Sequence, residues 1–118
     1  MVDFDKYMRD TSVVNGYLRH YVEQIDENII IITDLPTFSF GLEHNKETEE
    51  VAAYIPELYM ITFNYNVYIL DPEYFLNEIL PHELAHFVDH LLADEDYVSN
   101  HDATFQLVLK KCFNREYK

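Results

Sequence analysis

The amino-acid sequence predicts an α+β fold in which a small sheet packs with helices from both ends of the chain. Apolar residues recur every three or four positions over residues 2–26, whereas short apolar runs separated by prolines lie between residues 28 and 64. Helical patterns return over residues 71–92 and from about residue 100 to Arg115. With 118 residues, 48% of them hydrophobic, the chain suits one domain, residues 1–118, with its own core.

The first helix is expected over residues 2–26, with one apolar face available for packing. The residues at helical spacing on this face are Phe4, Met8, Thr11, Val14, Leu18, Val22 and Ile25. Asn15 and Gly16 fall in the middle, where glycine costs about 1 kcal/mol relative to alanine. We therefore expect a weak point or a bend there.

Three or four strands are expected between the helices. The β-branched run NIIIIT at residues 28–33 is too short for a helix and predicts a buried strand. Residues 38–42 alternate between large apolar and small side chains, which predicts a half-buried strand. Residues 51–55 and 58–64, separated by Pro56, predict two more. Because the connections are short, the sheet is expected to be mostly antiparallel.

The later helices have clear boundary signals. Asp71 followed by Pro72 is typical of a helix start, with an aspartate cap and proline at the first helical position. Pro81 has no N–H for the carbonyl four residues earlier, so a kink or short break is expected before His82. A cap at Ser99 or Asn100, together with Asp102, begins the last helix.

Composition excludes several classes of function. Eight Lys and Arg against 22 Asp and Glu give a net charge of −14, which disfavours direct binding to nucleic acids and to anionic membranes. The single cysteine, Cys112, excludes an internal disulfide, and a thiolate zinc cluster is also excluded. No run approaches the roughly 18 apolar residues of a membrane helix, and the acidic N-terminal segment does not resemble a signal peptide. We expect a cytoplasmic protein.

The segment LPHELAHFVDHLL, residues 80–92, contains an HExxH motif. On a helix, His82 and His86 are separated by about 6 Å along the axis and about 40° around it, so both imidazoles can reach one metal ion. Glu83 lies about 100° around the helix from His82, where it can contact a water at the metal rather than bind the metal itself. The competing interpretation is a helix with incidental surface histidines.

A catalytic zinc site needs a third protein ligand. His90 lies about 12 Å along the helix from His82, and helical side chains lean toward the N-terminus, so His90 suits a supporting role better than ligation. His101 begins the last helix, where the macrodipole favours a neutral imidazole, and Phe105 one turn later can anchor it to the core. Carboxylates stay open as alternative ligands: Asp94, Glu95, Asp96 and Asp102.

These segments resemble the SprT-like family of zinc metallopeptidases, whose members include the DNA–protein crosslink protease Spartan. The parts of the family pattern read ITFN, HELAH and HDATF in this chain, and the resemblance covers about residues 28–113. It implies a minimal zincin-like domain in which Glu83 is catalytic. The implied zinc ligands are His82, His86 and His101. Asp102 stands where the family usually has glycine.

The expected function is that of a zinc-dependent endopeptidase that hydrolyses a protein substrate with a metal-activated water and Glu83 as general base. Tyr97 or His90 is a candidate oxyanion partner. One alternative is a non-catalytic acidic module that occupies a basic or DNA-binding partner protein. A zinc hydrolase acting on a non-peptide amide is another. An unligated glutamate beside the metal favours catalysis over a structural site.

Overall fold

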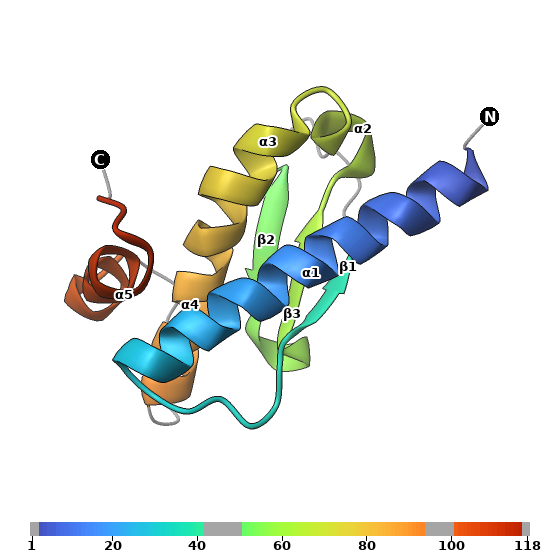
Figure 1. Ribbon diagram of the computed structural model, residues 1–118. Helices are drawn as coiled ribbons and strands as arrows, with labels where there is room; N and C mark the ends of the chain where they lie inside the picture. Colours follow the sequence, from blue (N-terminus) through green and yellow to red (C-terminus); the bar gives the residue numbers. More distant parts are fainter. Residues whose placement is uncertain (1–2, 42–50, 94–100, 117–118) are drawn as a thin grey trace.

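The computed structural model describes residues 3–41, 51–93 and 101–116. Figure 1 shows an α+β arrangement in which a long N-terminal helix crosses a small sheet and a column of later helices, as the sequence predicts. The elements in chain order are α1 (Phe4–Asn28), β1 (Thr37–Ser39), β2 (Ala52–Ile55), the 3₁₀ helix η1 (Pro56–Leu58), β3 (Met60–Phe63), α2 (Tyr65–Tyr68), α3 (Pro72–Tyr74), the π-helical turn η2 (Phe75–Ile79), α4 (Leu80–Leu92) and α5 (Ala103–Phe113). None of the helices described is long and apolar enough to cross a membrane.

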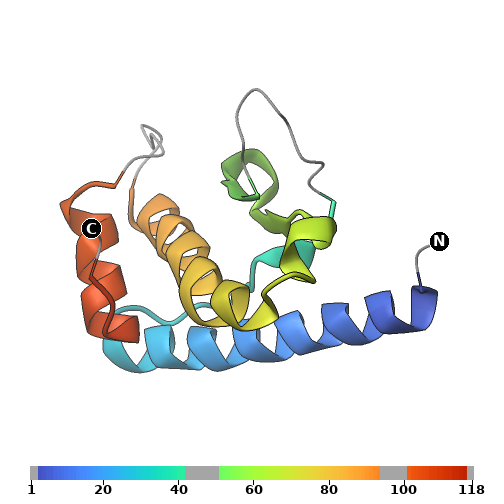
Figure 2. The same cartoon turned by 90° about the horizontal axis from the view of Figure 1, so that it is seen from above.

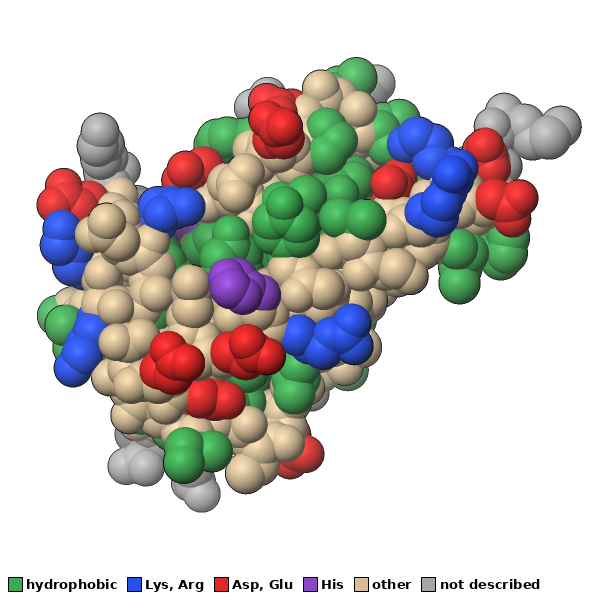
Figure 3. Space-filling view, in the orientation of Figure 1, with side chains coloured by type: hydrophobic (Ala, Val, Ile, Leu, Met, Phe, Trp, Pro, Cys, Tyr) green, Lys and Arg blue, Asp and Glu red, His purple; other side chains and the backbone are tan. Residues whose placement is uncertain are grey.

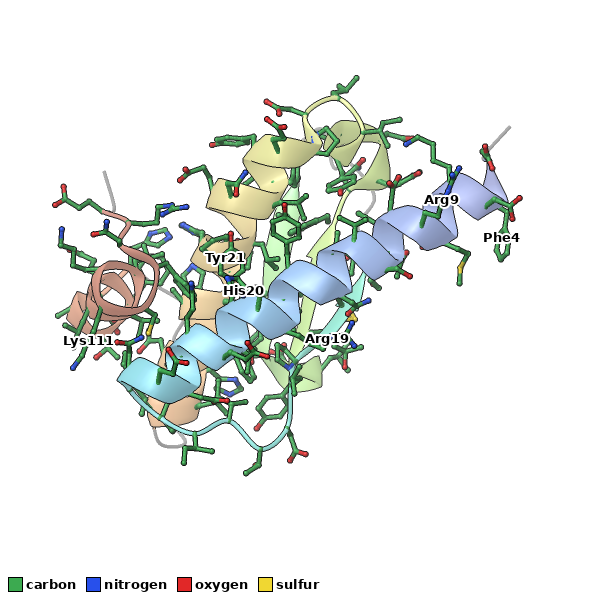
Figure 4. The ribbon with its side chains drawn as sticks, in the orientation of Figure 1. Phe4, Arg9, Arg19, His20, Tyr21 and Lys111 are labelled. Carbon is green, nitrogen blue, oxygen red and sulfur yellow. The ribbon has the colours of Figure 1, made fainter. Side chains whose placement is uncertain are left out.

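Helix α1 runs without interruption through Gly16, so the expected weak point does not break it. The side chain of Asp3 caps the helix by accepting a hydrogen bond from the Lys6 N–H at 3.1 Å. Its apolar face is buried only from Val14 onward, and its first turn extends beyond the rest of the molecule (Figure 2). Phe4, at the tip of this extension, is 69% exposed (Figure 4).

The sheet has three strands in the order β1-β3-β2. β2 pairs with β3 in the antiparallel sense, as expected for neighbours joined by the short η1 helix, whereas β1 runs parallel to β3. Phe38 of β1 and Tyr54 of β2 both lie opposite Ile61 of β3, which is fully buried. The core lies between this sheet, α1 and α4 (Figure 1).

The buried strand predicted at residues 28–33 is wrong. Helix α1 continues to Asn28, and the backbone N–H groups of Ile29 and Ile30 still donate to the carbonyl of Ile25, at 3.0 and 3.4 Å. The N–H of Ile32 donates to the Asp26 side chain at 2.7 Å. Because the end of the helix uses these donors, the segment forms a coil rather than a strand.

The helix predicted from Asp71 has both expected features. The Asp71 carboxylate caps it by accepting from the Tyr74 N–H at 3.2 Å. The break before His82 takes the form of η2, in which the N–H of Leu80 reaches back five residues to the Phe75 carbonyl. The turn therefore directs the start of α4, which carries the HExxH motif.

Candidate metal centre

Three histidines from two separate parts of the chain lie close together. α4 supplies His82 and His86, and His101 comes from the residues just before α5, which packs along α4 (Figure 2). One nitrogen from each imidazole lies within 4.8 Å of the other two. The Nε2 atoms of His82 and His101 are 3.3 Å apart. Residues 19 positions apart in the sequence thus share one small volume.

This spacing fits a tetrahedral metal ion. Metal–nitrogen bonds of about 2.0–2.1 Å, as for zinc, place two tetrahedral ligand atoms about 3.3–3.4 Å apart. The separation of 3.3 Å between Nε2 of His82 and Nε2 of His101 agrees with that value. The donor set of three imidazoles without thiolates is the chemistry that suits zinc and its first-row neighbours.

The electrostatic setting keeps two of the imidazoles neutral. Burial, followed by the neighbouring His82 and His101 rings, lowers the pKa of His86 to about 4. Burial and the proximity of His101 also lower the pKa of His82. A neutral imidazole has the lone pair that a metal requires, so the site is prepared for binding at neutral pH.

The ring of Phe105 contacts all three imidazoles of the histidine cluster. It is fully buried and stacks on His86, with 4.4 Å between the ring centroids, and it lies 4.9 Å from the rings of both His82 and His101. The Asp102 carboxylate accepts a hydrogen bond from the Phe105 N–H at 2.9 Å and caps α5. The cap and the aromatic anchor together bring His101 onto α4.

Glu83 is buried, with 8% of its surface exposed, and follows His82 on α4. Both side chains line a cleft of about 380 Å³. Other walls of this cleft come from Ala52 of β2, Tyr74, Ile79, Leu109 and Arg115. The buried Glu83 carboxylate thus belongs to a side chain that lines the same cleft as His82.

His90 does not join the cluster. Its Nδ1 lies 2.7 Å from the hydroxyl of Tyr54, and the ring of Tyr59 stacks on it with 4.9 Å between centroids. His90 thus attaches α4 to β2 and to the connection that precedes β3. This placement agrees with the supporting role that helix geometry assigns to it.

Asp89 is a buried group that the motif did not reveal. It is 4% exposed, and burial together with the adjacent Asp102 carboxylate raises its pKa to about 6. The sequence prediction missed Asp89, and its only signal is its position three residues after His86, on the same face of α4. Of the other candidates, Asp94, Glu95, Asp96 and Tyr97 lie outside the described residues.

Comparison with known proteins gives one match. The model of the SprT-like family matches residues 14–117, a span that includes the whole histidine cluster and extends beyond the segments that carry the sequence motifs. Neither the curated proteins nor the solved structures give a match. Because the family model covers most of the chain, the resemblance is confirmed, and this chain belongs to the SprT-like family, which has a zincin-like metallopeptidase fold.

Proposed function

We propose that the protein is a zinc-dependent endopeptidase with His82, His86 and His101 as zinc ligands and Glu83 as general base. The observation that supports this most directly is the combination of three imidazole nitrogens within 4.8 Å with a buried glutamate at the edge of a cleft. A structural zinc site has no use for a carboxylate in that position.

The metal and the residues around it have separate roles in the proposed hydrolysis. When bound, zinc acts as a Lewis acid that polarises the scissile carbonyl and acidifies a water molecule. Glu83 takes the proton from that water as it attacks and then delivers it to the departing amide nitrogen. Phe105 packs against the three imidazoles, and the cleft gives a peptide a place to lie beside Glu83.

The net charge of −14 supports a second candidate, an acidic module that occupies a basic or DNA-binding partner without cleaving it. The two candidates differ in what they require of Glu83. A binding module tolerates loss of this carboxylate, whereas a peptidase does not.

The decisive experiment compares Glu83→Gln with the wild type and with Glu73→Gln, which alters an exposed glutamate on α3. We expect all three proteins to contain about one zinc per chain by elemental analysis. Unfolded casein should be cleaved by the wild type and Glu73→Gln only. Cleavage by Glu83→Gln would remove Glu83 as the base, and a zinc-loaded wild type that cleaves neither casein nor basic proteins would favour the binding module.

A further inference from the structure

A second hollow, of about 450 Å³, lies between the loop that follows α1, the turn before β3, and α4. It shares no lining residue with the cleft that contains His82 and Glu83. Its apolar lining includes Ile30, Ile31, Leu35, Tyr59, Phe87 and Leu91. We refer to these six residues as the isoleucine groove.

The isoleucine groove exposes large apolar side chains. Ile31 is 76% exposed, Tyr59 is 50% exposed and Leu35 is 45% exposed. Leu58, beside Tyr59, is 61% exposed. Within the β-branched run, Ile32 is buried in the core, whereas Ile31 faces solvent. A contiguous exposed apolar surface of this kind is typical of an interaction site.

The rim of the groove is acidic. The last turns of α1 carry Glu23, Asp26 and Glu27 with no basic residue among them, and Figure 3 shows red carboxylate side chains gathered over this end of the helix. The loop adds Asp34, and η1 adds Glu57. Arg19 lies one turn before Glu23 on α1 (Figure 4), and none of the other seven Lys and Arg residues falls in residues 20–35, 51–63 or 80–93.

We propose that the isoleucine groove docks an amphipathic, cationic segment of a partner polypeptide. Apolar side chains of that segment fill the hollow beside Ile31 and Leu91, while its Lys and Arg side chains face the carboxylates of the α1 terminus. A second copy of this chain is a poor occupant because both copies carry a charge of −14. Nucleic acid has the same sign of charge and no aliphatic side chains for the hollow.

The test uses a labelled helix-forming peptide of leucine and lysine with all leucines on one face. A shuffled peptide of the same composition, with the leucines dispersed, is the control. Fluorescence anisotropy with the full chain should show binding of the amphipathic peptide that weakens as ionic strength rises. Equal binding of both peptides would overturn the proposal, because it would reflect net charge alone.

Variants locate the binding surface. We expect Ile31→Ser combined with Leu35→Ser, and separately Glu23→Gln combined with Glu27→Gln, to weaken binding roughly tenfold. All four residues are exposed, so folding is retained, and an unchanged circular dichroism spectrum checks this. Leu70→Ser, at a side chain 80% exposed outside the groove, and Glu73→Gln are the matched controls. Equal weakening by the controls, or amide shifts that map to the cleft near His82 rather than to Phe87 and Leu91, would assign the peptide to another surface.

Discussion

The guanidinium group of Arg115 donates hydrogen bonds from Nε and Nη2 to the backbone carbonyl of Asn77, at 3.3 and 3.2 Å. In an uninterrupted α-helix this carbonyl would accept from residue 81, which is proline. The neighbouring carbonyl of Leu76 would pair with the same residue in a π-helix, and it accepts instead from the Tyr21 hydroxyl at 2.8 Å. Side chains from α1 and from the segment after α5 therefore supply the donors that Pro81 lacks.

Removing the Arg115 guanidinium should destabilise the turn before the HExxH motif. We expect Arg115→Met to lower the free energy of unfolding by about 1 kcal/mol, since hydrogen bonds from a charged donor are strong but these groups are partly exposed. Denaturant unfolding measures the loss, and Lys111→Met, at an exposed site on α5 (Figure 4), is the control. Equal losses in both variants would contradict the role assigned to Arg115.

A double-mutant cycle with Pro81→Ala sharpens this prediction. Alanine at position 81 has an N–H that can donate to the Asn77 carbonyl, which makes the arginine redundant. Arg115→Met should therefore cost less in the Pro81→Ala background than in the wild type, with a coupling of roughly 1 kcal/mol. Additive effects would show that Arg115 acts elsewhere.

Much of this architecture could be predicted because its signals are local. The cap at Asp71, the interruption at Pro81 and the pairing of His82 with His86 all depend on residues within one or two helical turns. The prediction of a strand at residues 28–33 was wrong because a run of β-branched residues indicates only that the segment is apolar. It does not indicate whether the end of the preceding helix already uses the backbone N–H groups of the segment. The burial of that segment depended on tertiary packing that no local pattern contains.

In the candidate site, too, the features that depend on local sequence could be predicted, and those that depend on tertiary packing could not. Helix geometry separates His90 from the cluster, and the position of Phe105 one turn after His101 indicates how that histidine reaches α4. The burial of Asp89 could not be predicted, because it requires α5 to pack over a side chain that the motif leaves undetermined.

The assignment of the third ligand predicts a contrast between two histidines. His101→Ala should lose zinc affinity by orders of magnitude, because it removes one of three imidazoles. His90→Ala should retain zinc and lose only the contacts to Tyr54 and Tyr59. Titration against a metal indicator with both variants measures this difference. The reverse order of affinities would transfer the third ligand to His90.

The buried histidines predict acid sensitivity of the metal-free protein. The folded-state pKa of His86 is lowered to about 4 from the ordinary histidine value of 6.5, so between these pH values the unfolded chain binds a proton that the folded chain does not. This contribution to stability is complete above about pH 6.5 and is lost as the pH falls toward 4. The pKa of Asp89 is raised to about 6 from 3.8, so in this case the folded chain binds the extra proton. Its contribution to stability is therefore lost as the pH rises from about 4 to 6, opposite to that of His86.

Because the two contributions oppose each other, the difference between variants is the useful measurement. Chelator-treated wild type and His86→Gln should be unfolded with denaturant at several pH values from 7 down to 5. His86→Gln should lose less stability across this range than the wild type. His20→Gln, at an exposed position on α1 (Figure 4), should follow the wild type. A His86→Gln curve parallel to the wild type would refute the lowered pKa.

Phe105 provides a test that separates the metal site from general packing. Phe105→Leu removes the ring that contacts all three imidazoles, and Phe113→Leu removes a buried ring on the same helix that packs against Tyr21. Both should lower the free energy of unfolding by similar amounts, about 1–2 kcal/mol, because both trim a buried aromatic side chain. Only Phe105→Leu should also weaken zinc binding, since the imidazoles lose the surface that holds them at ligand spacing. If the two variants bound zinc equally well, the spacing of the histidines would be set by their own helices and not by Phe105.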